Sequence, residues 1–319
     1  MTRLAINRET ISRSYNRTRH HVRTTPTLAV SPRDIAGAFS ELHLKLELLQ
    51  HAGSFKVRGA ITHFMLGDIP ESGVIAASGG NHGAAVAYAA SAFNAPARIF
   101  VPEISAPAKK KLIQELGAEL VVGGARYADA LAASEQAASE SGAKVLHAYD
   151  QPETLLGQGS VGLELEQQAP GLTTLLVAVG GGGLIGGIAA WYQGRIKIVA
   201  VEPETAPTLK AAIEAGKPVD VDVSGLAADS LGARRIGQLA FPLCQSFVEE
   251  AVTVTDDAIR NAQAVLWQKT RLMAEPGGAA ALAALISGAY VPAEDERVGV
   301  IICGANTDVF DFASGDATA

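Results

Sequence analysis

The chain has few aromatic residues, few charged residues and only two cysteines. Aromatic side chains make up 5% and charged side chains 18% of its 319 residues, whereas hydrophobic residues make up 48%. This composition excludes a long disordered chain, which would be rich in charge and poor in apolar residues. The formal net charge is −7, and a nucleic-acid-binding surface would need a basic face instead. Length and composition together indicate one large globular domain or two ordinary ones.

Signals for export or membrane insertion are also lacking. Cys244 and Cys303 stand far apart and have no metal-binding spacing, so free thiols in a reducing cytoplasm are expected, with a single disulfide as the alternative. No apolar run approaches the roughly 18 residues of a membrane span. The N-terminal stretch is rich in arginine without an apolar segment, which excludes a secretory signal and leaves an organellar transit peptide as the alternative. We therefore expect a cytoplasmic protein that binds neither nucleic acid nor membrane.

Short apolar runs alternate with helical patterns along most of the chain. The expected strands are 74–77, 97–102, 119–122, 145–147, 173–179, 196–201 and 298–302. The expected helices are 84–93, 109–116, 127–139, 184–192, 256–270 and 279–286. A break rich in Gly and Pro is expected near 150–160, and a looser region over 202–247.

The strands are continuously apolar, which is typical of parallel sheets that helices cover on both faces. The pattern therefore predicts an α/β protein. The segment 73–149 is expected to form a small domain inserted in a large one, which is built from residues 1–72 and 150–319.

One lysine lies between small residues, just before an apolar helix. Lys56 follows Gly53-Ser54-Phe55, and its place near a helix N-terminus is unfavourable for a positive charge. Its pKa should therefore be lowered, which suits Schiff-base chemistry. A surface lysine beside a turn is the alternative that this motif alone leaves open.

Two glycine turns each follow a strand and precede a helix. The turn at 78–83 lets the backbone approach a ligand closely, and the helix N-terminus behind it suits an anion such as a carboxylate. An ordinary capped turn is the alternative there. The turn at 180–183 holds four glycines, whose N–H groups can cradle a phosphate. Because it also fits GxGxxG from Gly181 to Gly186, with Glu202 ending the next strand, an NAD-binding oxidoreductase is a competing interpretation.

Two further motifs lie near the C-terminus. Glu275-Pro276-Gly277-Gly278 places a carboxylate before a helix of small residues. Cys303-Gly304-Ala305-Asn306 follows the last strand, where ligand sites of α/β proteins usually lie. A buried cysteine is most often just a small hydrophobic residue, so Cys303 alone indicates little.

In this order, the motifs resemble those of threonine/serine dehydratases and serine racemases, a group of fold-type II pyridoxal-phosphate enzymes. The matching motifs are Ser-Phe-Lys-x-Arg-Gly, Ser-x-Gly-Asn-His-Gly, the tetraglycine loop, Glu-Pro-x-Gly and Cys-Gly-x-Asn. The resemblance covers nearly the whole chain. It implies a tryptophan-synthase-β-like fold of two parallel-sheet domains, with pyridoxal 5'-phosphate in the cleft between them, and a homodimer.

The resemblance also implies a role for each motif. Lys56 would hold the cofactor as a Schiff base and act as the base at the substrate α-carbon. The residues implied to bind the cofactor with it are Phe55, Asn81, Gly180, Gly181, Gly182, Gly183, Leu184, Glu275 and Cys303. Within this set the glycine loop would bind the phosphate, Asn81 the ring hydroxyl, and Cys303 would face the pyridine nitrogen. The residues implied to surround the substrate carboxylate are Ser78, Gly79, Asn81 and His82.

The chain departs from the family in three respects. Serine racemases carry a serine at the position of Gly79 as the base on the second face, so its absence favours dehydration over racemisation. The family's divalent-metal site pairs a glutamate with an aspartate six residues later. Here Glu202 is a possible ligand, but Thr208 takes the second place. The chain ends shortly after its last expected strand, so we expect neither the C-terminal regulatory domain of biosynthetic threonine dehydratases nor isoleucine feedback.

The expected activity is the β-elimination of water from a small β-hydroxy-amino acid such as L-threonine or L-serine, which gives a 2-oxo acid and ammonia. Alternatives are a dehydratase for a larger substrate of phenylserine or 3-hydroxyaspartate type and an amino-acid racemase. A β-replacing synthase and a non-catalytic ligand-binding relative are further alternatives. The loop within 202–247, including Ala228, Asp229 and Ser230, is expected to line the pocket for the substrate side chain.

Overall fold

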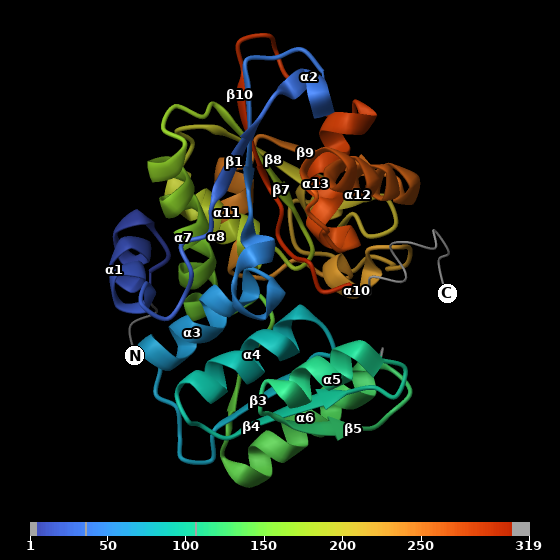
Figure 1. The fold of residues 1–319 in the computed structure, drawn as a ribbon. Helices are drawn as coiled ribbons and strands as arrows, with labels where there is room; N and C mark the ends of the chain where they lie inside the picture. Colours follow the sequence, from blue (N-terminus) through green and yellow to red (C-terminus); the bar gives the residue numbers. More distant parts are fainter. Residues whose placement is uncertain (1–4, 36, 106, 308–319) are drawn as a thin grey trace.

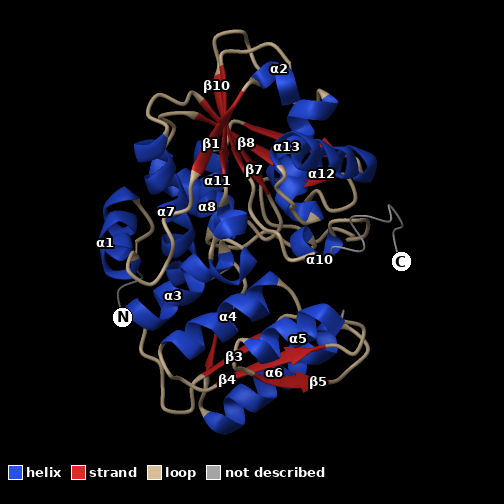
Figure 2. Cartoon of the chain, viewed as in Figure 1, coloured by secondary structure: helices blue, strands red, loops and turns tan. Residues whose placement is uncertain are grey.

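The computed structural model describes residues 5–35, 37–105 and 107–307, which fold into two sheets packed with helices (Figures 1 and 2). One sheet has the strand order β1-β2-β10-β7-β8-β9 and the other the order β5-β4-β3-β6. Neighbouring strands are parallel throughout except for β1 and β2, which are antiparallel. The α/β fold class with two parallel sheets is thereby confirmed.

The strands and helices have the following bounds. The six-stranded sheet holds β1 (Thr27–Val30), β2 (Glu41–Lys45), β7 (Thr174–Ala178), β8 (Lys197–Pro203), β9 (Glu250–Val254) and β10 (Arg297–Ile301). The four-stranded sheet holds β3 (Val74–Ala77), β4 (Ala97–Val101), β5 (Glu119–Val122) and β6 (Lys144–Val145). The helices are α1 (Arg8–Thr18), α2 (Pro32–Ile35), α3 (Lys56–Leu66), α4 (Asn81–Ala92), α5 (Pro107–Glu115), α6 (Tyr127–Ser141), α7 (Pro152–Gln168), α8 (Gly183–Tyr192), α9 (Thr208–Ala215), α10 (Ala228–Leu231), α11 (Ala240–Phe247), α12 (Asp256–Thr270) and α13 (Pro276–Ser287).

The four-stranded sheet buries both of its faces. Val74 and Ile99 belong to one apolar cluster, whereas Ile75 and Phe100, one position further along each strand, pack in another. Successive side chains of a strand point to opposite faces, so a sheet that is covered on both sides needs continuous apolar strands. In Figure 1 this sheet and its helices lie below the six-stranded sheet. None of the helices in the described part of the chain combines the length and the apolar character needed to cross a membrane.

The expected break near 150–160 is wrong, because these residues begin the 17-residue helix α7. Pro152 stands in the first turn, where a missing N–H costs nothing. The glycines that suggested a loop lie instead at close helix contacts. A Cβ on Gly157 would lie 2.5 Å from the backbone oxygen of Arg58 in α3, and one on Gly159 would lie 2.9 Å from that of Gly187 in α8. These glycines let three helices approach one another closely.

Two strand ends bring the site motifs together. β7 and β10 are parallel neighbours, with Val298 opposite Thr174. Their carboxyl ends therefore open at the same edge of the sheet, which is the usual place for ligands of α/β proteins. The tetraglycine turn follows β7 and Cys303 follows β10, so segments far apart in the sequence meet there.

Candidate active site

One pocket collects most of the residues that the motifs indicated. It is lined by Phe55, Lys56, Asn81, Tyr149, Ala178, Gly180, Gly181, Gly182, Gly183, Leu184, Ile185, Ser230, Leu231, Glu275 and Cys303. Four helices begin at or beside this pocket, namely α3, α4, α8 and α13. The N-terminal end of a helix carries a partial positive charge and unpaired N–H groups. The pocket therefore favours an anionic ligand.

The tetraglycine turn has the geometry of a phosphate cradle. Gly182 caps α8 with φ of 88°, a left-handed conformation that favours glycine. Tyr149 covers the turn so closely that a Cβ on Gly181 would overlap its ring. Because the first N–H groups of α8 have no partner within the helix, they are available to phosphate oxygens. These residues fit a cofactor that carries a phosphate.

Lys56 presents an amine to the same pocket. Its Nζ donates a hydrogen bond to the backbone oxygen of Ala148 at 2.9 Å and lies 5.3 Å from the ring centroid of Phe55. The residue keeps partial exposure along the pocket, and desolvation of its amine lowers the pKa to about 8, against the opposing effects of Cys303 and Glu275. About a tenth of the amine is therefore neutral and nucleophilic at pH 7, far more than at the ordinary lysine pKa.

This pKa predicts how the apoprotein captures an aldehyde cofactor. Only the neutral amine attacks a carbonyl, so the rate constant for capture should rise with pH and level off above about 8. The measurement is stopped-flow absorbance after mixing apoprotein with pyridoxal phosphate across a pH series. The same series with pyridoxamine phosphate, which has no aldehyde, is the control. A midpoint near the ordinary lysine pKa would contradict the prediction.

A chain of polar contacts runs through Asn81 and Glu275, which both line the pocket. Asn81 donates from Nδ2 to Oε1 of Glu275 at 2.5 Å, and Asn306 donates from Nδ2 to Oδ1 of Asn81 at 2.7 Å. Burial raises the pKa of Glu275 to about 7, although the hydrogen bond from Asn81 opposes this shift. The Cys303 thiol donates to the backbone oxygen of Gly277 at 3.3 Å, and burial raises its pKa, so it remains a neutral thiol.

Three residues that were predicted to contact the substrate do not line this pocket. Ser78 accepts a hydrogen bond on Oγ from the Gly80 N–H at 3.3 Å. His82 lies 2.8 Å from the backbone oxygen of Leu146 through Nε2, and burial lowers its pKa to about 3, so it is neutral. Gly79 packs beside a hydroxyl, since a Cβ on it would lie 2.5 Å from Oγ of Ser105. All three flank Asn81, which does line the pocket.

Glu202 lies away from the pocket and caps helix α9. Its two carboxylate oxygens accept the N–H groups of Leu209 and Lys210 at 2.6 and 2.9 Å, and Thr208 donates to the backbone oxygen of Ala233 at 2.8 Å. A carboxylate already bound to a helix N-terminus, beside a hydroxyl donor, does not fit a divalent cation. Among the described residues, no three His, Cys, Asp or Glu side chains are placed to hold a metal ion. Because both carboxylate oxygens of Glu202 accept backbone N–H groups, Glu202 is not available to bind the ribose of NAD, as the NAD interpretation requires.

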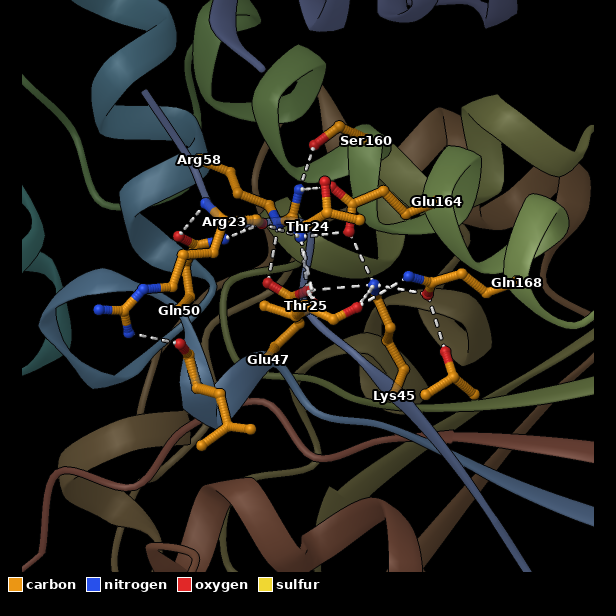
Figure 3. Close-up of polar contacts among 12 residues, drawn as sticks. Arg23, Thr24, Thr25, Lys45, Glu47, Gln50, Arg58, Ser160, Glu164 and Gln168 are labelled. Carbon is orange, nitrogen blue, oxygen red and sulfur yellow. Dashed lines mark hydrogen bonds and ion pairs between the residues drawn. The ribbon is translucent and has the colours of Figure 1, made fainter. Parts of the chain in front are cut away.

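A buried ionic network lies directly behind Lys56, and we name it the Arg58 network (Figure 3). Its charged members are Lys45, Glu47, Arg58 and Glu164, each 1% exposed or less. The guanidinium of Arg58 donates to both oxygens of Glu47, at 2.7 and 2.7 Å, and to both oxygens of Glu164, at 2.8 and 2.7 Å. Lys45 adds a bond of 2.7 Å to Glu164.

The Arg58 network ties four segments of the chain to the helix that starts at Lys56. Two cations and two carboxylates give it no net charge. Figure 3 shows these side chains together, and they come from strand β2, the turn at 47–49, helix α3 and helix α7. Thr25 and Ser160 complete it with hydroxyl contacts. Buried charges persist when they are paired and fully hydrogen-bonded, as they are here.

Sequence reasoning missed several residues of the site. Tyr149 and Leu231 line the pocket, yet they carry no motif of their own. Lys109 forms an ion pair with Asp229, the residue before Ser230 of the pocket lining, and the carboxylate of Glu275 partly opposes the lowering of the Lys109 pKa by burial. Asn306 donates a hydrogen bond to Asn81 and holds it in place. Its position in the Cys-Gly-x-Asn motif was the one sequence feature that pointed to a role in the site.

The fold and the pocket define an enzyme that binds a phosphate-bearing cofactor beside a reactive lysine. The family model described as "Pyridoxal-phosphate dependent enzyme" matches residues 18–304. The chain is 35% identical to the phenylserine dehydratase of Ralstonia pickettii, over 93% of this chain and 92% of that protein. It is 37% identical to an L-threonine ammonia-lyase of Geobacter sulfurreducens, over 84% of this chain and 68% of that protein.

Among solved structures, maize serine racemase superposes with a TM-score of 0.91 at 30% identity, over 98% of this chain and 97% of that one. The chain therefore belongs to the family of pyridoxal-phosphate-dependent enzymes that includes threonine ammonia-lyases and serine racemases. Its cofactor is pyridoxal 5'-phosphate. This membership also decides against the NAD-binding interpretation of the tetraglycine loop.

Proposed function

We propose that the protein is an ammonia-lyase that dehydrates a small β-hydroxy-amino acid such as L-threonine or L-serine. The products are a 2-oxo acid and ammonia, because the enamine left after loss of water hydrolyses. The observation that carries the proposal is the convergence of Lys56, the glycine cradle and Asn81 in one pocket. The similarity to L-threonine ammonia-lyase and phenylserine dehydratase supports the reaction type. We further propose a cytoplasmic homodimer, with residues 1–72 and 150–319 as its large domain and 73–149 as its small one.

The cofactor, when bound, accepts the electron pair that is left at the substrate α-carbon. Lys56 would hold it through its amine and, once displaced by the substrate, would take the α-proton. The N–H groups of Gly180 to Leu184 would bind the phosphate, and Asn81 would bind the ring hydroxyl. Phe55 would pack beside the ring.

Cys303 and the turn before α4 complete the proposed roles. A neutral thiol at Cys303 does not hold a ring nitrogen protonated as an aspartate would. The resulting electron sink is moderate, which suits elimination because the leaving group departs quickly. Ser78, Gly79, Asn81 and His82 would surround the substrate carboxylate, and the free N–H groups of α4 would supply the positive field.

Assays with a panel of β-hydroxy-amino acids test this proposal. We expect 2-oxo acid from L-threonine or L-serine with the cofactor-loaded enzyme, measured as the coloured hydrazone. Chiral analysis of serine from the same reaction tests the racemase alternative, and little D-serine is expected because Gly79 has no side chain to take a proton. An enzyme that yields no 2-oxo acid from any member of the panel, or that interconverts the serine enantiomers faster than it dehydrates them, would contradict the proposal.

A further inference from the structure

Next to the pocket, an ion pair joins a helix that packs with the four-stranded sheet to a helix of the segment that follows β8. The ammonium of Lys109, on helix α5, contacts the carboxylate of Asp229, on helix α10. Helix α5 packs with the four-stranded sheet, whereas α10 belongs to the segment that follows β8. Figure 1 shows the two helices facing each other from the lower and the upper part of the molecule. The contact therefore bridges the parts of the chain that supply the two sides of the pocket.

Lys109 is more buried than a surface lysine of the same helix. Its side chain is 21% exposed, whereas that of Lys111 on the same helix is 76% exposed. Burial lowers the pKa of Lys109, and the carboxylate of Glu275 partly opposes this effect. Because Glu275 lines the pocket, the Lys109 ammonium lies within electrostatic reach of it.

Asp229 lies between Lys109 and the glycine turn before α4. A Cβ on Gly80 would lie 3.7 Å from the backbone oxygen of Asp229 and 3.9 Å from its Oδ1. The next two residues, Ser230 and Leu231, line the pocket. Helix α10 therefore forms the wall that faces the turn proposed to hold the substrate carboxylate.

A pair of opposite charges at this place discriminates between substrates by charge. An uncharged β-substituent leaves the contact between Lys109 and Asp229 intact. A second carboxylate would have to displace Asp229 from Lys109 and would then lie beside a like charge, which is a strong penalty. We propose that the Lys109–Asp229 pair restricts the enzyme to β-hydroxy-amino acids with an uncharged β-substituent, and that Asp229 is the residue that excludes substrates of 3-hydroxyaspartate type. This inference rests on the proposed function and specifies its substrate class.

Two variants of the cofactor-loaded enzyme test the proposal. Asp229→Asn removes the repelling charge and frees the ammonium, so the kcat/KM for 3-hydroxyaspartate relative to that for L-threonine should rise by about tenfold or more. Lys109→Met breaks the same ion pair but keeps the repelling carboxylate, so it should not raise this ratio. Both changes remove the ion pair, and the two variants differ in the charge that remains. The side chain of Asp229 is 58% exposed, so its replacement leaves no cavity in a packed core.

Binding without turnover separates this proposal from the proposed function. Succinate and butyrate are compared as ligands of the cofactor-loaded enzyme by calorimetry, because they differ by one carboxylate. Asp229→Asn should tighten the binding of succinate by about tenfold more than that of butyrate, because only succinate carries a second carboxylate. An unchanged preference, or an equal change in both variants, would overturn the role of Asp229. If the wild-type enzyme dehydrates no substrate but Asp229→Asn still shifts the binding preference, the proposed reaction alone is overturned.

Discussion

Replacement of Lys56 by alanine is expected to reduce 2-oxo acid formation by about 10³-fold or more, since it removes both the attachment point of the cofactor and the proposed general base. General bases alone contribute about 10² to 10⁴ in rate. No other lysine lines the pocket among the described residues, so no neighbouring amine can take over. The measurement is kcat/KM for L-threonine at saturating cofactor, together with the visible absorbance of the lysine-bound cofactor, which should disappear.

The variant should nevertheless still bind the cofactor, because the glycine cradle is intact. Equilibrium dialysis is expected to show weaker, non-covalent binding of pyridoxal phosphate, which separates loss of chemistry from loss of the site. Lys111→Ala is the matched control, since Lys111 is 76% exposed and pairs with Glu115 on the surface. It should keep wild-type activity. A Lys56→Ala enzyme that retained more than a few hundredths of wild-type kcat/KM would show that another group moves the α-proton.

The glycine turns and the lysine of this site could be predicted from short stretches of sequence. The strands that carry the glycine turns are continuously apolar, and the turns that follow them stand where helices begin. Lys56 was predicted to have a lowered pKa from its place before a helix, and desolvation has that effect in the folded chain. Neither inference required knowledge of which segments meet in space.

Contacts between distant segments could not be predicted in this way. Tyr149 covers Gly181 because the segment before α7 lies against the tetraglycine turn, and no feature near residue 149 indicates that position. The pairing of Lys109 with Asp229 likewise depends on how α5 and α10 are oriented. Helix α7 was mistaken for a break because glycine at a helix–helix contact and glycine in a loop look alike in sequence. Packing decides between them, and packing is a property of the whole fold.

The Arg58 network gives the second large effect. Glu164→Ala is expected to lower the free energy of unfolding by about 3–5 kcal/mol, because it leaves a buried cation without its partner. Glu164 is 1% exposed and accepts bonds from both Arg58 and Lys45. Without it, Glu47 alone must balance two cations in the protein interior. The measurement is urea unfolding of the apoprotein, so that cofactor binding does not contribute.

Glu166 offers a matched control two residues along the same helix. It pairs with Arg8 and Arg195, but its side chain is 30% exposed, and both arginines are more exposed still. Exposed ion pairs contribute about 0–1 kcal/mol, so Glu166→Ala should cost far less than Glu164→Ala. Equal losses in the two variants would show that helix α7 tolerates neither change and that buried charge is not the cause.

The pH dependence of the difference identifies the carboxylate charge as its source. Burial alone would raise the pKa of Glu164, but the charges of Arg58 and Lys45 outweigh burial and lower it. A carboxyl whose pKa is lower in the folded state stabilises the fold above its unfolded pKa and loses that contribution as the pH falls through its folded pKa. The gap in unfolding free energy between wild type and Glu164→Ala should therefore be constant near neutral pH and narrow below about pH 4. If the difference in unfolding free energy stays constant down to the acid-unfolding range, the loss comes from packing around the shortened side chain and not from the carboxylate charge.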